Sequence, residues 1–288
     1  MAGKGVLVPY SYQSLTAALA SAGIEEAADE AALLLEHFVG ASRVTLMLER
    51  NCVFSDERLD EAVKRRMERY PLQYILGKWE FYGLPFTVDE RCLVPRPDTE
   101  CLVEEAIRRL PRGGKFADLC TGSGCIAVAT LHNRPDLTAA ALELYPETLA
   151  LAVKNAGDNG VSDRMTPILA DLLNGGDKAL AESAPFDAIL SNPPYIPTAT
   201  VFGLSPEVRQ EPFAALDGGE DGLVFYRAIL RDYPKLLKPG GLMLLEIGYD
   251  QGDALRTLCA EYLPDASVGV LRDLGGNERV VHITLPAL

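Results

Sequence analysis

The N-terminal part of the chain has apolar residues at steps of three and four positions, which is the spacing of amphipathic helices. The repeats are Leu15–Leu19, Ala31–Val39, Leu46–Leu48 and Leu59–Met67. Gly23 and Gly40 are suited to end two of these helices, and Ser55-Asp56 to cap the fourth. The pattern therefore predicts a small helical domain at residues 1–75.

A two-residue alternation follows the helical pattern. It covers the stretch from Trp79 to Pro95, where Gly83 and Pro85 divide it into two short apolar segments. Two such segments around a glycine are typical of a hairpin. We therefore expect a β-hairpin linker at residues 76–97, followed by the main domain at residues 98–288.

Beyond Lys115, short apolar runs alternate with amphipathic helical stretches. This alternation predicts an α/β fold with a doubly wound, mainly parallel sheet and helices on both faces. The first five runs are Phe116–Leu119, Ala139–Leu142, Met165–Leu169, Phe186–Leu190 and Leu242–Ile247. The link between two closing runs, Ser267–Leu271 and Val280–Leu285, is too short for a parallel crossover. One antiparallel strand should therefore end the seven-stranded sheet.

Composition narrows the possible partners. The chain has 27 Lys and Arg against 41 Asp and Glu, a net charge of −14. This balance disfavours direct nucleic-acid binding and an anionic membrane surface. The basic run Lys64-Arg65-Arg66 alternates with acidic residues, as on a solvated helix face. No secretory leader and no apolar run of about 18 residues is visible, so we expect a soluble, cytoplasmic monomer.

The cysteines and histidines give no sign of a metal site. The 6 cysteines include no C-x-x-C pair, and the 3 histidines stand apart from one another. Structural and catalytic metal sites need several such ligands at short, regular spacings. We therefore expect no metal.

Polar and glycine residues follow the first three apolar runs. Asp118 to Cys125 reads DLCTGSGC, in which the glycines let the backbone approach a ligand at a helix N-terminus. Glu143, after the second run, could accept both hydroxyls of a ribose. Asp171 and Leu172, after the third, could bind the amino group and cover the ring of an adenine. Together they favour a nucleoside ligand, while a tight turn and a helix cap at Asp171 remain the structural alternatives.

The fourth run ends in Asn192-Pro193-Pro194-Tyr195, which we call the proline corner. The prolines lack an N–H and fix φ, so the turn is stiff and presents carbonyl oxygens. The Asn192 side-chain oxygen and the Pro193 carbonyl could each accept one hydrogen of a planar –NH2 group, and Tyr195 could stack on it. Such a grip would aim the nitrogen at an electrophile. The alternative is a rigid loop in which Asn192 caps its own backbone.

The order of glycine loop, acidic strand end and N-P-P-Y is that of S-adenosylmethionine-dependent amino-methyltransferases. Within that group the chain resembles the release factor glutamine methyltransferases, the HemK/PrmC family, over nearly its whole length. The resemblance implies their Rossmann-like fold. It is carried by the segments PLQYILG at 71–77, LVPRPDTE at 93–100, SNPPYI at 191–196, EPFAALDGGEDGL at 211–223, LKPGGLMLLEIGYDQ at 237–251 and GGNERVV at 275–281.

This resemblance implies methyl transfer from S-adenosylmethionine to the side-chain nitrogen, N5, of the glutamine in the Gly-Gly-Gln motif of peptide chain release factors. It implies that the helical domain docks the release factor. The implied catalytic and glutamine-binding residues are Asn192, Pro193, Pro194 and Tyr195. With Asp171 from the strand-end argument, the expected cofactor-binding residues are Cys120, Thr121, Gly122, Ser123, Gly124, Glu143, Asp171, Leu172 and Asn192.

Four positions depart from the family's usual pattern. The family commonly has glycine in place of Cys120, aspartate in place of Glu143, serine in place of Tyr145 and often an aromatic residue in place of Leu172. Because the carboxylate and an apolar cover are kept, these departures bear on cofactor affinity rather than on the type of reaction. Thiol chemistry at Cys120 is disfavoured, since no histidine is near it in sequence.

Several alternative functions share parts of this pattern. The glycines with Glu143 could serve a dehydrogenase, but the proline corner has no role in hydride transfer. DNA adenine-N6 methyltransferases also use N-P-P-Y on a flipped base, yet they need a basic surface. Methylation of a ribosomal-protein glutamine would use the same chemistry. A non-catalytic module that binds S-adenosylmethionine would keep the fold, but the proline corner is intact.

Overall fold

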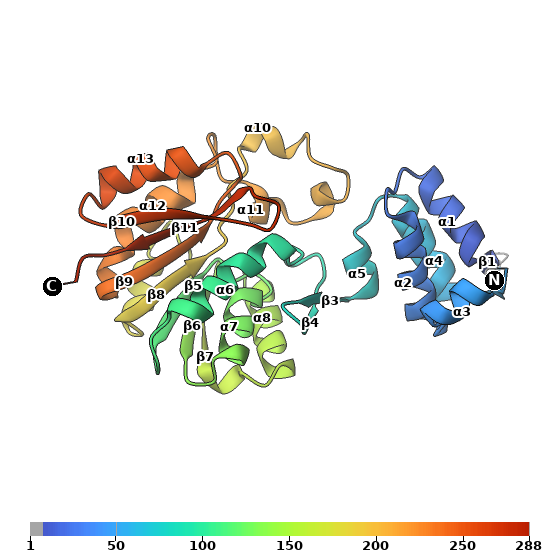
Figure 1. Ribbon diagram of the computed structural model, residues 1–288, viewed down its shortest axis with the longest axis horizontal. Coiled ribbons are helices and arrows are strands. Elements are labelled where there is room, and N and C mark those ends of the chain that lie inside the picture. The colour runs from blue at the N-terminus through green and yellow to red at the C-terminus, as the bar shows by residue number, and fades with distance from the viewer. Residues whose placement is uncertain (1–7, 50, 288) are drawn as a thin grey trace. The chain divides into compact units, whose positions relative to one another are not determined.

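The computed structural model describes residues 8–49 and 51–287, which form two compact units. The helical unit comprises the chain up to Gly77 together with the separate segment Ser205–Gln210. The sheet unit comprises Lys78–Leu204 and the chain from Glu211 onward (Figure 1). Within the described residues, no helix combines the length and the apolar character needed to cross a membrane.

The helical unit is built as its apolar spacing predicts. Its core contains Leu15, Leu19 and Leu34, which the helices bury completely. Gly40 ends one helix in the left-handed conformation at φ 68°, and Asp56 caps another by accepting from the Leu59 N–H. The elements are β1 (Tyr10–Ser11), α1 (Tyr12–Ser21), α2 (Ala27–Val39), α3 (Arg43–Leu48), β2 (Val53–Phe54), α4 (Glu57–Met67), α5 (Leu72–Leu76) and, from the separate segment, η3 (Val208–Gln210). The short antiparallel pair β1–β2 was not predicted.

The basic run on α4 is only partly a solvated face. Lys64 and Arg65 are exposed, but Arg66 is buried. Its guanidinium donates to Glu30 at 2.5 Å and to Glu207 at 2.9 Å, and Arg69 also donates to Glu207. Two carboxylates from distant parts of the chain thus compensate the burial of Arg66, and they attach the segment Ser205–Gln210 to the helical unit.

The sheet unit begins with the expected hairpin. Strands β3 (Lys78–Phe81) and β4 (Leu84–Thr87) pair antiparallel, with Phe81 opposite Leu84. Gly83 turns the chain between them at φ 72°. Asn155 Oδ1 accepts from the Thr87 N–H at 2.8 Å, and Asn155 Nδ2 donates to the Thr87 carbonyl at 3.0 Å. The hairpin is thereby fixed to the helix that carries Asn155.

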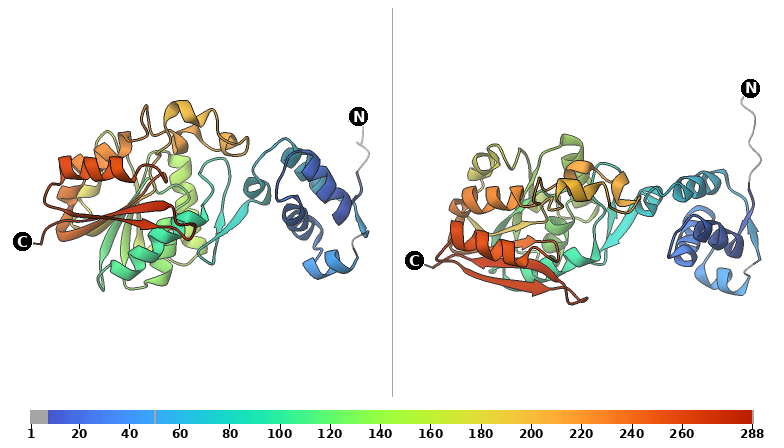
Figure 2. Two further views of the ribbon diagram at one scale, coloured as in Figure 1. Left: turned by 45° about the horizontal axis from the view of Figure 1, so that its top comes forward. Right: turned by 90° about the horizontal axis from the view of Figure 1, so that it is seen from above.

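Seven strands form the main sheet in the order β10–β11–β9–β8–β5–β6–β7. β11 is antiparallel to both neighbours, which confirms the single antiparallel strand, and it lies second from the edge rather than at it (Figure 2, in red). The strands are β5 (Lys115–Leu119), β6 (Thr138–Glu143), β7 (Met165–Leu169), β8 (Phe186–Ser191), β9 (Leu237–Glu246), β10 (Ser267–Arg272) and β11 (Glu278–Thr284).

Helices cover both faces of this sheet, so the doubly wound α/β fold is confirmed. In Figure 1, α6, α7 and α8 lie on one face, and α12 and α13 on the other. The helices and turns of this unit are η1 (Pro97–Thr99), α6 (Glu100–Arg109), α7 (Cys125–Asn133), α8 (Pro146–Asp158), η2 (Ser162–Arg164), α9 (Gly176–Ala181), α10 (Thr198–Val201), α11 (Phe213–Leu216), α12 (Val224–Asp232), η4 (Pro234–Leu236) and α13 (Gly252–Tyr262).

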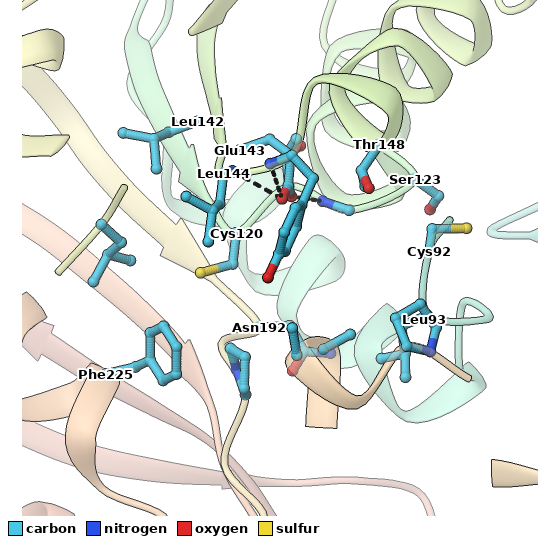
Figure 3. A pocket seen from close by; sticks show the side chains of 18 of the residues that line it. Cys92, Leu93, Cys120, Ser123, Leu142, Glu143, Leu144, Thr148, Asn192 and Phe225 are labelled. Carbon is cyan, nitrogen blue, oxygen red and sulfur yellow. Dashed lines mark hydrogen bonds between the residues drawn. The ribbon is translucent and has the colours of Figure 1, made fainter. Parts of the chain in front are cut away.

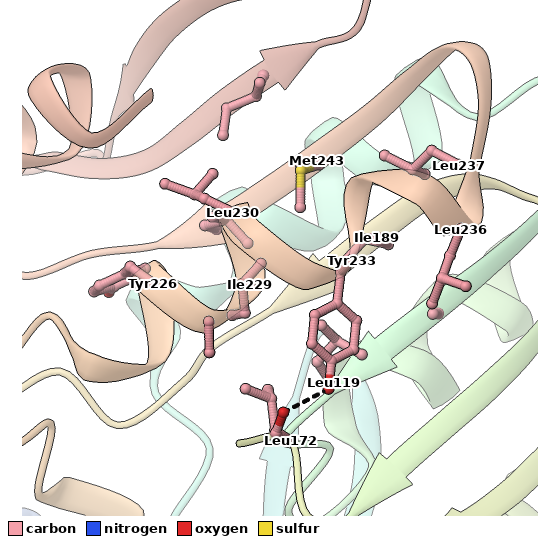
Figure 4. Close-up of a cluster of buried hydrophobic side chains, with 14 of the residues drawn as sticks. Leu119, Leu172, Ile189, Tyr226, Ile229, Leu230, Tyr233, Leu236, Leu237 and Met243 are labelled. Carbon is pink, nitrogen blue, oxygen red and sulfur yellow. Dashed lines mark hydrogen bonds between the residues drawn. The ribbon is translucent and has the colours of Figure 1, made fainter. Parts of the chain in front are cut away.

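The hydrophobic core beneath α12 extends to the carboxyl ends of the parallel strands, where it includes Leu172. Tyr226, Ile229 and Tyr233 of this region pack on the inward residues of β8 and β9 (Figure 4). The Tyr233 hydroxyl, itself fully buried, donates to the Leu172 carbonyl at 2.8 Å. A buried hydroxyl without a hydrogen-bond partner would lower the stability of the fold. The bond from Tyr233 therefore holds the loop after β7 against α12.

Candidate functional site

A pocket of about 410 Å³ lies where the parallel strands end. The chain runs outward from β5 through β6 to β7, then returns to β8 on the other side of β5. Doubly wound sheets bind ligands at this switch point. The loops after β5, β6, β7 and β8 all contribute to the wall, and Figure 3 shows Asn192 across the pocket from Glu143.

The loop after β5 has the backbone that its glycines predict. Gly122 and Gly124 have φ of 57° and 81°, in the left-handed region that glycine adopts freely. A side chain at Gly124 would put its Cβ 3.1 Å from that of Ala152 on α8. The Thr121 N–H donates to the Leu142 carbonyl at 3.0 Å, which ties the loop to β6. The loop therefore approaches the pocket with backbone rather than bulky side chains.

Glu143 holds this loop by its carboxylate. Its Oε2 accepts from the Gly122 N–H at 3.0 Å, and its Oε1 accepts from the N–H groups of Leu144 at 2.8 Å and Tyr145 at 3.2 Å (Figure 3). A carboxylate offers about four acceptor positions, so at least one stays available to a ligand hydroxyl. Glu143 thus lines the pocket and also organises two of its loops.

Cys120 occupies a position that favours glycine. Its φ is 58°, a conformation that is uncommon for residues with a side chain. Burial raises the pKa of its thiol well above the ordinary value, and the charges of Glu143 and Asp118 raise it further. The thiol is therefore protonated at neutral pH and is a poor nucleophile.

We predict that Cys120→Gly keeps the activity of the protein. The backbone conformation suits glycine, and no reactive thiolate is lost. The kcat should stay within about twofold of wild type, equivalent to about 0.5 kcal/mol. Cys125, whose thiol pKa is also raised by burial, offers a matched Cys125→Ala control. A loss of activity confined to Cys120→Gly would restore thiol chemistry as a candidate.

After β7 the chain contributes two residues to the pocket: Asp171, whose carboxylate is already hydrogen-bonded, and Leu172, which is apolar. Asp171 lines the pocket, but its Oδ1 accepts from the Leu173 N–H and its Oδ2 from Asn174 Nδ2, at 2.8 and 2.7 Å. Asp171 therefore stabilises a turn and does not cap a helix, since the N-cap residue of α9 is Gly175. Leu172 also lines the pocket, and its carbonyl is the one that Tyr233 binds.

The proline corner is supported from two sides. The Ser191 hydroxyl donates to the Leu119 carbonyl at 2.7 Å, and Gln251 Nε2 donates to the Tyr195 carbonyl at 2.9 Å. A Cβ at Gly222 would lie 2.3 Å from the Tyr195 carbonyl oxygen, so the Gly-rich segment after α11 packs directly on the corner. Within the described chain, no N–H or O–H donates to the Pro193 carbonyl.

Asn192 and Pro194 line the pocket, whereas the lining residues do not include Pro193 and Tyr195. Asn192 Nδ2 donates to the Thr99 hydroxyl at 3.3 Å. Burial raises the pKa of the Tyr195 hydroxyl, and the charge of Glu246 raises it further. The corner thus presents Asn192 to the pocket, while the Tyr195 side chain lies outside the pocket and is mostly buried.

Sequence reasoning missed a second half of the pocket wall. It comes from two segments, residues 93–100 and 211–223, that Glu211 joins. The Glu211 carboxylate accepts from the Val94 N–H at 3.0 Å and pairs with Arg96. Both segments, LVPRPDTE and EPFAALDGGEDGL, lay in family motifs to which no pocket role had been given. The missed lining residues include Leu93, Arg96, Thr99, Phe213 and Asp217 from these segments, and Phe225 just beyond the second one.

Two family descriptions match most of the chain. "PrmC N-terminal domain" matches residues 12–77 and "Methyltransferase small domain" matches residues 97–205. A protein of Geobacter sulfurreducens named release factor glutamine methyltransferase is 44% identical over 242 residues, 82% of each chain. One of Moorella thermoacetica with the same name is 40% identical over 266 residues, covering 91% of this chain and 92% of its own.

The chain belongs to the release factor glutamine methyltransferase family. This membership confirms the expected family and the expected enzyme class, an S-adenosylmethionine-dependent methyltransferase. The fold agrees with it. A solved methyltransferase structure from Pyrococcus furiosus superimposes with a TM-score of 0.52 at 19% identity, covering 72% of this chain and 91% of that one.

Proposed function

We propose that the protein transfers the methyl group of S-adenosylmethionine to the side-chain nitrogen, N5, of the glutamine in the Gly-Gly-Gln motif of peptide chain release factors. One observation carries the choice of a planar amide as acceptor. Asn192 Nδ2 is bound to Thr99 while Asn192 lines the pocket, so its Oδ1 remains free to accept an N–H from the substrate. The family members named above act on release factor glutamine by name, which supports the substrate.

The pocket residues fit the cofactor. The left-handed backbone at Gly122 and Gly124 provides a cradle that added side chains would disturb. Glu143 would accept ribose hydroxyls, while Leu172 and Phe225 supply apolar surface for an adenine ring. When bound, S-adenosylmethionine supplies an activated methyl group on a positively charged sulfur. Cys120, Thr121, Ser123 and Asp171 complete the proposed contacts.

The proline corner would orient the substrate nitrogen. Asn192 Oδ1 and the Pro193 carbonyl would each accept one hydrogen of the glutamine amide and so fix its plane. Orientation of this kind can supply several kcal/mol, with about 7–11 kcal/mol as the limit for well-aligned groups. The two acceptors also stabilise the positive charge that the nitrogen gains as it is alkylated. No strong base is needed before the attack, because the nitrogen becomes acidic only at that stage. Pro194 would keep the corner rigid, and Tyr195 would close it from behind.

The helical unit would dock the release factor. Its helix α3 exposes Val44, Met47 and Leu48 at 66, 68 and 79% of their surfaces, which is unusual for adjacent apolar side chains on a soluble protein surface. We assign this docking role to residues 1–75, the hairpin linker to residues 76–97 and the transfer chemistry to residues 98–288. A release factor as substrate would place the reaction in the cytoplasm.

The test is transfer of a labelled methyl group to purified release factor. We expect one labelled glutamine in wild-type release factor and none in its Gln→Ala variant at the Gly-Gly-Gln motif. Duplex DNA and a ribosomal protein serve as competing substrates in the same assay. Label on the ribosomal protein or the DNA, with none on the release factor, would refute the proposed substrate. Cofactor binding without transfer to any of them would point to a non-catalytic module.

A further inference from the structure

A buried carboxyl group lies behind the proline corner and has no part in the reaction described so far. Glu246 is the last residue of β9, and only 1% of its surface is exposed. Its Oε2 is buried and has no hydrogen-bond partner among the residues that the structure describes. The Tyr226 hydroxyl donates to the Glu246 carbonyl at 2.6 Å and so fixes its backbone. A buried polar atom left in this way calls for an explanation.

Thr99 links this carboxyl group to the proposed catalytic corner. It is 2% exposed, lines the pocket, and accepts from Asn192 Nδ2 at 3.3 Å. Hydrogen bonding from the Thr99 hydroxyl, and more weakly from the Tyr195 hydroxyl, lowers the pKa of Glu246 and so favours its charged form. Glu246 therefore interacts with Tyr195, at one end of the proline corner, and with Thr99, which contacts Asn192 at the other end.

The direction of these hydrogen bonds decides what Asn192 offers to the pocket. A hydroxyl has one hydrogen to donate, and a carboxylate can only accept. If Thr99 gives its hydrogen to Glu246, its oxygen can only accept, so the –NH2 end of Asn192 must face Thr99. The Asn192 oxygen then faces the pocket. If Thr99 were free to donate to Asn192 instead, the carboxamide could turn and present a donor to a substrate that needs an acceptor.

We propose that Glu246 is a positioning residue that acts through Thr99 to keep the Asn192 carboxamide oxygen turned toward the substrate amide. This role rests on the proposed function for its effect on turnover, but the orientation itself does not depend on which substrate is methylated. Glu246 is not among the pocket-lining residues, so it would act only through Thr99 and Asn192.

The protonation of Glu246 should control this arrangement. Burial raises the pKa of Glu246 to about 7, against hydrogen bonding from Thr99 and the charge of Arg279, which lower it. Above that pH the group is a carboxylate and holds Thr99 as described. Below it the carboxyl O–H can donate to Thr99, and the constraint on Asn192 is lost. The titratable and charged groups that act on Glu246 or that it acts on are Asp98, Cys101, Cys125, Tyr195, Tyr226 and Arg279.

The kinetic test compares Glu246→Gln, Thr99→Val and Thr99→Ser. We expect Glu246→Gln and Thr99→Val to lower kcat by about tenfold each, and Thr99→Ser to restore most of it, because only the hydroxyl matters. The dissociation constant of S-adenosylhomocysteine should stay within about threefold of wild type. The double variant Glu246→Gln/Thr99→Val should be no slower than either single variant, since both act through one chain of hydrogen bonds.

Stability separates this role from a structural one. The folded-state pKa of Glu246 is raised, so its contribution to stability is fully present below the unfolded pKa and is lost as the pH rises through about 7. At pH 8 the buried charge is a cost, and Glu246→Gln should therefore have a Tm equal to or above that of wild type while turning over more slowly. A lower Tm with equal losses of kcat and of cofactor affinity would show a purely structural role and overturn the proposal.

A readout that needs no release factor distinguishes this proposal from the proposed function. The side-chain amide signal of Asn192, assigned by its loss in Asn192→Ala, can be followed by NMR in protein labelled with 15N-asparagine. We expect it to shift with a midpoint near pH 7 in the wild type and not to titrate in Glu246→Gln. If the Asn192 signal of the wild type does not shift with pH, the positioning role is overturned, even if release factors are methylated. A titrating signal supports it even if another substrate is found.

Discussion

Replacing Asn192 by alanine is expected to lower kcat by about 5- to 150-fold, because a substrate N–H left without its acceptor costs about 1–3 kcal/mol. The loss should fall on turnover rather than on cofactor affinity. Asn192 faces the pocket from the end of β8, opposite Glu143, and its Nδ2 is already held by Thr99. Removing its side chain therefore takes away the grip on the acceptor nitrogen and leaves the glycine loop intact.

Single-turnover rates with release factor and a titration with S-adenosylhomocysteine would measure the two quantities separately. Asn133→Ala makes the same substitution at the end of α7, where the amide only donates to the Ala129 carbonyl, and it should leave both unchanged. Wild-type turnover in Asn192→Ala would remove this residue from the catalytic role.

Replacing Glu143 by alanine should have the opposite bias and weaken cofactor binding. The variant loses the proposed acceptor for the ribose hydroxyls, and it also leaves the N–H groups of Gly122, Leu144 and Tyr145 without their present acceptor. We expect the dissociation constant of S-adenosylhomocysteine to rise by about 10- to 100-fold, which corresponds to about 1.4–2.7 kcal/mol. At saturating cofactor, kcat should change far less.

Glu143→Asp is the matched control, since it keeps a carboxylate that is one methylene shorter. Calorimetric titration should place its affinity between those of wild type and Glu143→Ala. Binding by Glu143→Ala that equals wild type would exclude Glu143 from the cofactor site and leave it only the structural role of holding the loops.

Most of the main sheet was predictable because its strands contain short apolar runs bounded by polar or glycine residues, although β9 begins at Leu237 and not at the predicted Leu242. Phe186–Ser191 and Met165–Leu169 follow their runs almost residue for residue. The strand-end rule then brings Cys120, Glu143, Leu172 and Asn192 to one pocket. These placements follow from the local periodicity of apolar residues and from the alternation of strands and helices, and both can be read from the sequence.

Other features depend on contacts between residues far apart in the chain, so the local sequence pattern around each residue predicts the wrong burial or role. Arg66 reads as one more solvated cation, yet Glu30 and Glu207 allow it to be buried. Glu246 looks like the polar end of a strand, and Thr99 like part of a helix start. Asn192 donates to Thr99 from 93 positions away in the chain, and this long-range contact is what brings Thr99 to the pocket residue Asn192.

The order β10–β11–β9 has a consequence for the synthesis of this protein. β11 follows β10 in the chain but inserts between it and β9, so neither neighbour is fully paired until β11 has left the ribosome. β11 also carries Arg279, whose carbonyl accepts from the Ile247 N–H at 2.9 Å, directly after Glu246. A nascent chain would thus lack the support beneath its proline corner until translation has passed Arg279. The proposed site would therefore gain its support only after β11, the last strand of the sheet in chain order, has been synthesised.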